Sequence, residues 1–269
     1  MTPEELSKQI RKKGSFLCVG LDTDMDRIPE HLKKEADPVF AFNRAIIEAT
    51  HEYAVAYKPN IAFYESLGSK GWDSLAKTME IIPKDIFTLA DAKRGDIGNT
   101  SRMYAKTFFE TYDFDGVTVA PYMGKDSVSP FLSFKDKWVF LLALTSNPSS
   151  HDFQHHKEEG EALYEKVLKK GKSWDEESEG HLGFVVGATQ ANSLAHIRKI
   201  VPDSYLLIPG VGAQGGDLDA VCVHGKNHTG EGMLINSSRG IIYAGSGKDF
   251  AQEAAQQARH LQATMKGYL

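Results

Sequence analysis

Short runs of apolar residues recur along the chain, separated by longer segments in which apolar residues follow a helical spacing. The runs are continuous rather than alternating, which is typical of parallel strands buried on both faces. There are eight of them, at residues 16–21, 54–58, 86–91, 116–119, 139–144, 183–187, 205–208 and 232–236. The pattern therefore predicts eight buried strands.

The segments between the runs predict helices. Residues 38–53 follow Asp37, a plausible N-cap, and begin with Pro38, which suits the first helical position. Residues 248–265 place apolar side chains three and four positions apart and predict a terminal helix. Eight strands that alternate with helices predict a (β/α)8 TIM barrel of the α/β class, formed by residues 1–269 as a single domain.

The connection after the fifth strand, residues 145–182, is much longer than the others. We expect an ordered insertion of about residues 149–181 over the barrel mouth, with a helix over 158–170, rather than a second domain. His151, His155 and His156 lie in it, but the last two are adjacent in a polar segment. Solvated surface is therefore a better interpretation than a zinc site.

The composition argues against some classes of binding partner. A chain of 269 residues with 41% hydrophobic residues can form one large core, and its net charge of −5 argues against a nucleic-acid or polybasic membrane surface. No apolar stretch is long enough to cross a membrane, and the first residues lack the apolar region of a signal peptide. Cys18 and Cys222 lie in apolar runs and predict buried thiols. We expect a cytoplasmic protein in which an anionic ligand needs a local positive site.

Charged residues gather after the second and third strands. Asp91 and Lys93 are two apart at the end of the third strand and should both face the barrel mouth, where Lys58 ends the adjacent strand. Charges of alternating sign about 4 Å apart interact by about 4 kcal/mol at an effective dielectric near 20, which would keep Lys58, Asp91, Lys93 and Asp96 ionised. Such an array can deliver a proton to a developing carbanion, although a structural ion pair at the rim is the alternative.

The spacing Asp91-x-Lys93-x-x-Asp96 resembles the signature of orotidine 5'-phosphate decarboxylases. Gly20-Leu21-Asp22 after the first strand and Lys58 after the second match that family's order, and the resemblance covers essentially the whole chain. Phe63-Tyr64-Glu65 and the long insertion are similar to its larger bacterial (type 2) subgroup. The resemblance implies a carboxy-lyase of pyrimidine biosynthesis that converts orotidine 5'-monophosphate to uridine 5'-monophosphate and CO2 without metal or organic cofactor.

The resemblance also implies roles for individual residues. Asp22 would bind a ribose hydroxyl, Lys58 would link the ribose to the charged array, Asp91 would lie against the substrate carboxylate, and Lys93 would protonate C6. Members of the family are homodimers, in which Asp96 and Thr100 would reach the neighbouring site.

Three further loops resemble the family's base and phosphate sites. Ser146 would bind the base, and the glycine-rich segment 209–216 would grip the phosphate, with Gly212 in it and Gln214 spanning base and phosphate. Ser238 and Arg239 follow the eighth strand, where barrels commonly bind phosphate, and the arginine fork suits two parallel hydrogen bonds. Glycine-rich turns alone are weak indications of a ligand.

Three alternatives are open from the sequence. Magnesium-dependent sugar-phosphate lyases share the Asp-x-Lys-x-x-Asp spacing but place an acidic metal ligand where this chain has Lys58, which would repel the cation. A class I aldolase would need a lysine in an apolar site, whereas carboxylates surround these lysines and favour their charged form. The third alternative is a nucleotide-binding barrel without activity, against which the intact charged array argues.

Overall fold

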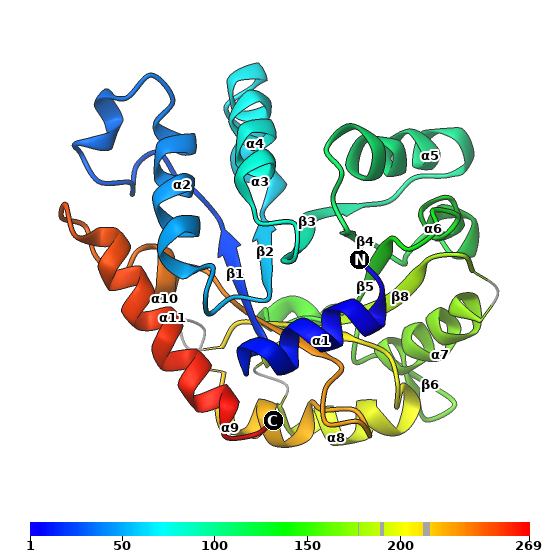
Figure 1. The fold of residues 1–269 in the computed structure, drawn as a ribbon. Coiled ribbons are helices and arrows are strands. Elements are labelled where there is room, and N and C mark those ends of the chain that lie inside the picture. Colours follow the sequence, from blue (N-terminus) through cyan, green and yellow to red (C-terminus); the bar gives the residue numbers. More distant parts are fainter. Residues whose placement is uncertain (177, 189–190, 212–215) are drawn as a thin grey trace.

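Eight parallel strands close a barrel in the order β1-β10-β9-β8-β5-β4-β3-β2 (Figure 1). The computed structural model describes residues 1–176, 178–188, 191–211 and 216–269. The strands are β1 (Leu17–Leu21), β2 (Ala56–Pro59), β3 (Phe87–Arg94), β4 (Gly116–Val119), β5 (Trp138–Leu144), β8 (His181–Val186), β9 (Leu206–Pro209) and β10 (Met233–Ser237). The predicted (β/α)8 barrel and its eight strands are confirmed, but β3 extends beyond its predicted end at residue 91.

Helices follow the strands and cover the outside of the barrel (Figure 1). They are α2 (Pro38–Thr50), α3 (Ile61–Glu65), α4 (Ser69–Ile81), α5 (Gly98–Lys106), the π-helical turn η2 (Thr107–Thr111), α6 (Lys125–Leu132), α8 (Ala191–Ile200), α9 (Leu218–His224), α10 (Arg239–Ile242) and α11 (Phe250–Lys266), with the 3-10 turn η1 (Leu32–Lys34) before α2. The helices predicted over residues 38–53 and 248–265 are present as α2 and α11, and Asp37 caps α2 by accepting from the Phe40 N–H. The helices α2 and α11 pack together through the stacked rings of Phe42 and Phe250.

The N-terminal end of the barrel is closed by α1 (Pro3–Lys13), which the sequence analysis did not predict. Its Leu6 and Ile10 are fully buried, and the Trp138 indole donates to the Met1 carbonyl at 2.7 Å. Capping was the available signal, because Thr2 and Glu5 form a capping box. With this end covered, the carboxyl ends of the strands form the accessible face of the barrel.

The insertion after β5 is ordered, but its helix begins later than predicted. It consists of η3 (Pro148–Asp152), a hairpin of β6 (Lys157–Glu158) and β7 (Glu161–Ala162), and α7 (Leu163–Asp175). The hairpin turns at Glu159 and Gly160, whose φ values of 53° and 88° are incompatible with a right-handed helix. The prediction of a helix from residue 158 was therefore wrong for its first turn.

Of the three histidines of the insertion, which we expected on a solvated surface, only two are exposed. His151 and His156 are exposed, whereas His155 is half-buried, with its ring stacked on that of His151 at 4.2 Å and packed against Tyr164. Elsewhere Cys18 and Cys222 are free, buried thiols, as predicted. None of the helices in the described ranges has both the length and the apolar character that crossing a membrane requires.

Candidate active site

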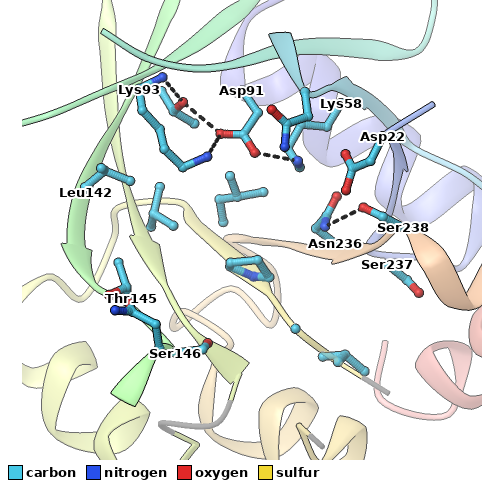
Figure 2. A pocket seen from close by; sticks show the side chains of 18 of the residues that line it. Asp22, Lys58, Asp91, Lys93, Leu142, Thr145, Ser146, Asn236, Ser237 and Ser238 are labelled. Atoms are coloured by element: carbon cyan, nitrogen blue, oxygen red, sulfur yellow. Dashed lines mark hydrogen bonds and ion pairs between the residues drawn. The ribbon is translucent and has the colours of Figure 1, made fainter. Parts of the chain in front are cut away.

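A cavity of about 360 Å³ opens at the carboxyl ends of the barrel strands (Figure 2). Its size lies in the range of small-molecule sites, and its wall contains both apolar and charged side chains. The lining residues are Asp22, Lys58, Asn60, Asp91, Lys93, Thr118, Leu142, Thr145, Ser146, Asn147, Val185, Leu207, Pro209, Gly210, Val211, Asn236, Ser237, Ser238 and Arg239. The structure thus brings together seven of the residues that the sequence analysis selected: Asp22, Lys58, Asp91, Lys93, Ser146, Ser238 and Arg239.

Three of the four members of the predicted charged array are in contact. Asp91 accepts from the Lys58 ammonium at 2.8 Å through one carboxylate oxygen and from the Lys93 ammonium at 2.5 Å through the other (Figure 2). The Lys58 side chain is 4% exposed and the Lys93 side chain is 51% exposed. Asp91 therefore joins a buried cation to one that faces the open cavity.

The charges of the array hold one another ionised. Burial alone would raise the pKa of Asp91, but the Lys58 and Lys93 ammonium groups outweigh it and keep that pKa well below its usual range. Burial likewise would lower the pKa of Lys58, but Asp91 and then Asp22 raise it above its ordinary value. Each member of the Lys58–Asp91 pair therefore favours the charged form of the other.

Lys93 reaches Asp91 along a backbone path that the sequence did not predict. Its φ is 47°, in the left-handed region, and the pairing of β3 with β4 shifts register between Ala90 and Arg94. The Lys93 N–H donates to Thr118 Oγ1 at 2.9 Å, and the same hydroxyl donates to Asp91 at 3.1 Å. Thr118, on β4, thus fixes both partners of the ion pair.

Asp96 and Thr100 do not line the cavity of their own chain. The Asp96 carboxylate accepts from the adjacent Ile97 N–H at 2.7 Å, and Thr100 is exposed on α5. Within one chain the array therefore has three members, because β3 ends at Arg94 and the chain leaves the barrel before Asp96. The expectation that Asp96 and Thr100 reach a neighbouring site stays a prediction.

Three residues that line this cavity each carry a buried polar atom without a hydrogen-bond partner. Within the described residues, Asp22 Oδ1, Ser146 Oγ and Asn236 Oδ1 are buried and make no hydrogen bond. All three residues line the cavity, and Figure 2 shows them around its rim. Because an unpaired buried polar atom costs roughly 1–3 kcal/mol, these atoms mark positions where a polar ligand would restore hydrogen bonds.

Two glycines allow the polar side chains to approach the barrel closely. A Cβ on Gly187 would lie 2.0 Å from Ser146 Oγ, and a Cβ on Gly20 would lie 1.8 Å from Ser238 Oγ. Any other residue would displace these hydroxyls. Glycine is therefore required at both positions if Ser146 and Ser238 are to keep their places.

Arg239 lies at the exposed rim, at the start of α10, and makes no ion pair with any residue in the described part of the chain. Its guanidinium is a local positive charge in a chain of net charge −5. Gly212 and Gln214 lie outside the described residues, although their neighbours Gly210 and Val211 line the cavity.

Several lining residues were not selected as site residues from the sequence, although Asn60 and Ser237 belong to polar clusters that follow predicted strands. Thr118, Asn236 and Ser237 occupy the last positions of buried strands, and Asn60 follows directly after β2. A polar residue at the carboxyl end of a barrel strand was the available signal. The described residues include no group of three His, Cys, Asp or Glu side chains suited to holding a metal ion.

Comparisons with known proteins agree with this geometry. A family model described as "Orotidine 5'-phosphate decarboxylase / HUMPS family" matches residues 15–254. The chain is 58% identical to the orotidine 5'-phosphate decarboxylase of Phocaeicola vulgatus over 99% of this chain and 98% of that one. It is also 58% identical to that of Christiangramia forsetii, over 100% and 99% of the two chains.

Solved structures show the same fold. A crystal structure from Toxoplasma gondii superposes with a TM-score of 0.88 at 36% identity, covering 99% of this chain and 98% of that one. The structure of Leishmania donovani OMP decarboxylase superposes with a TM-score of 0.83 at 37% identity, covering 98% and 100%.

Proposed function

The chain belongs to the orotidine 5'-phosphate decarboxylase / HUMPS family, and from this premise we propose how its residues carry out the reaction. It converts orotidine 5'-monophosphate to uridine 5'-monophosphate and CO2 in pyrimidine biosynthesis. Our proposal is that the bond from C6 to the carboxylate breaks, that CO2 leaves, and that the Lys93 ammonium delivers its proton to the electron pair left on C6. The ion pairs of Asp91 with Lys58 and Lys93 are the observation that carries it.

The array suits this step electrostatically. Lys93 is the cation that faces the open cavity, whereas Lys58 is buried behind Asp91. A fixed ammonium stabilises negative charge as it develops and needs no reorganisation when the charge forms. Asp91 holds this ammonium in place and, lying against the substrate carboxylate, favours departure of CO2.

Substrate binding is proposed for the polar rim. Asp22 would bind a ribose hydroxyl, Lys58 would link the ribose to the array, and Ser146 would bind the base; the unpartnered Asp22 Oδ1 and Ser146 Oγ support these roles. Arg239 and Ser238 would hold the phosphate, since Arg239 is a cation at the rim and forms no ion pair within the described part of the chain. Gly212 and Gln214 are proposed for the same phosphate site on the resemblance of their loop to the family's.

The test is turnover of orotidine 5'-monophosphate by the purified protein in excess EDTA, followed by loss of the orotate absorbance. We expect the wild type to form uridine 5'-monophosphate in EDTA and Lys93→Ala to lose about 10²–10⁴-fold in kcat, the usual contribution of a positioned general acid. Activity that returns only with added magnesium would contradict the metal-free step.

We further propose that the protein works as a homodimer in which Asp96 and Thr100 enter the neighbouring site. Large apolar side chains near these residues are exposed on the single chain, with Ile97 at 53%, Tyr122 at 92%, and Met103 and Met123 close to half. An exposed apolar cluster of this kind favours burial against a second copy.

Mixing two inactive variants tests the shared site. Lys93→Ala and Asp96→Asn each disable a site, but a mixed dimer keeps one site with Lys93 of one protomer and Asp96 of the other. Random exchange in a two-fold dimer should restore roughly a quarter of wild-type activity. No recovery in a preparation proven to contain mixed dimers would contradict the shared site.

The free thiols of Cys18 and Cys222 support a reducing, cytoplasmic location. Fractionation of cells with an antibody against the protein would test this proposal.

A further inference from the structure

In the insertion after β5, the side chain of Gln154 is hydrogen-bonded to the loop of residues 145–147, which lines the cavity. The Gln154 amide is hydrogen-bonded to both the N–H and the hydroxyl of Thr145, the first residue after β5. Its Oε1 accepts from the Thr145 N–H at 2.7 Å, and its Nε2 donates to Thr145 Oγ1 at 2.9 Å. The Thr145 hydroxyl in turn donates to Asn147 Oδ1 at 2.6 Å.

These bonds hold the loop of residues 145–147 on both sides of Ser146. Thr145, Ser146 and Asn147 all line the cavity, and Figure 2 shows Thr145 and Ser146 side by side at its edge. Ser146 Oγ is the buried, unpartnered atom of this loop. Gln154 therefore fixes the backbone that carries Ser146 and leaves the hydrogen-bonding capacity of the Ser146 hydroxyl unused.

Gln154 is itself held by the rest of the insertion. Its N–H donates to the Ser150 carbonyl at 2.8 Å, and its carbonyl accepts from the Tyr164 N–H at 3.0 Å, at the start of α7. The helix α7 is anchored to the barrel, because its Leu168 and Gly171 are buried and it packs on β5 and β8. A continuous path of hydrogen bonds and packing thus runs from the barrel wall through α7 to the 145–147 loop.

We propose that Gln154 is a positioning residue, through which the insertion sets the place of Ser146 and so the enzyme's affinity for the pyrimidine base. This inference rests on the proposed contact between Ser146 and the base. Gln154 does not line the cavity, so its effect is exerted through Thr145.

The experiment measures the dissociation constants of uridine 5'-monophosphate and of ribose 5-phosphate, which lacks the base. Gln154→Met keeps the length of the side chain and removes both hydrogen bonds. We expect Gln154→Met to raise the dissociation constant of uridine 5'-monophosphate about tenfold, since two neutral hydrogen bonds are lost. The dissociation constant of ribose 5-phosphate should not change. Phe153→Ala, at the adjacent and 70% exposed position, is the matched control and should change neither constant.

A merely structural role predicts a different result. If Gln154→Met weakens both ligands equally, or neither, the inference is overturned. Should Gln154→Met fold poorly, Gln154→Glu replaces it, since a carboxylate keeps the acceptor for the Thr145 N–H and loses the Nε2 donor. Gln154→Glu should weaken the binding of uridine 5'-monophosphate alone, by less than tenfold. An equal loss of affinity for ribose 5-phosphate would overturn the inference.

Ser146→Ala separates this inference from the proposal beneath it. If Ser146→Ala leaves the affinity for uridine 5'-monophosphate unchanged, the Ser146 contact is wrong and the role of Gln154 is overturned with it. If Ser146→Ala lowers the affinity for uridine 5'-monophosphate and Gln154→Met does not, the role of Gln154 alone is overturned. Turnover of orotidine 5'-monophosphate by the wild type tests the enzyme's activity independently of both.

Discussion

Replacing Thr118 with valine should separate the geometry of the ion pair from its charges. Valine has nearly the same shape as threonine, so the packing of a side chain in a position that is 1% exposed is preserved. The change removes the acceptor of the Lys93 N–H at 2.9 Å and one donor to Asp91 at 3.1 Å. It leaves Lys58, Asp91 and Lys93 chemically intact.

The expected cost follows from these two bonds. The hydrogen bond to the Asp91 carboxylate is charge-assisted and contributes about 1.5–3 kcal/mol, which corresponds to roughly 10–100-fold in rate if it is lost from the transition state. The Lys93 N–H would be left without its partner in a residue whose φ of 47° is already unfavourable. We therefore expect kcat to fall by about 10–100-fold, with KM changed much less.

The assay is steady-state decarboxylation of orotidine 5'-monophosphate by the wild type, Thr118→Val and Thr118→Ser. Serine keeps the hydroxyl and should retain activity within about fourfold of the wild type, because the lost methyl group is equivalent to one CH2 and costs about 0.8 kcal/mol. Circular dichroism confirms that the variants are folded. Equal losses for valine and serine, or a wild-type kcat for valine, would refute the positioning role of the Thr118 hydroxyl.

Two further changes have defined outcomes. Gly187→Ala places a Cβ 2.0 Å from Ser146 Oγ and 2.8 Å from the Ser146 N, so the 145–147 loop must move. A shift of about 1 Å can cost about 10²-fold in kcat/KM, so we expect a loss of that order for Gly187→Ala in the same assay. A wild-type kcat/KM would show that the loop tolerates the shift. Burial raises the pKa of Asp175 from 3.8 to about 6, so stability falls as pH rises through the window from about 4 to about 6. Asp175→Asn should abolish this decline and raise the free energy of unfolding at pH 7 by about 1 kcal/mol. Urea denaturation at both ends of the pH window measures the effect. An unchanged dependence of stability on pH would contradict the prediction.

The barrel could be predicted from the sequence because its signals are local. Each strand is a continuous apolar run, and the polar residues that follow the strands meet at one end of any parallel barrel. The contact of Lys58 with Asp91 followed from this rule alone, since β2 and β3 are neighbours. For the same reason seven selected site residues lie around one cavity.

Other features depend on contacts between distant residues. The left-handed backbone at Lys93 is held by Thr118, on another strand, and nothing in the sequence near Lys93 indicates it. The turn at Glu159 and Gly160 overrode a helical spacing of apolar residues. The position of Asp96 outside the cavity of its own chain depends on where β3 ends, which the spacing of the motif does not reveal.

The proton transfer itself can be observed on the product. If Lys93 protonates C6, microscopic reversibility requires that the enzyme also remove the C6 proton of uridine 5'-monophosphate and exchange it with solvent. In D2O the wild type should therefore catalyse loss of the H6 signal in the proton NMR spectrum, and Lys93→Ala should be slower by about 10²–10⁴-fold while still binding the nucleotide. Equal exchange by the two proteins would contradict the assignment of Lys93 as the proton donor.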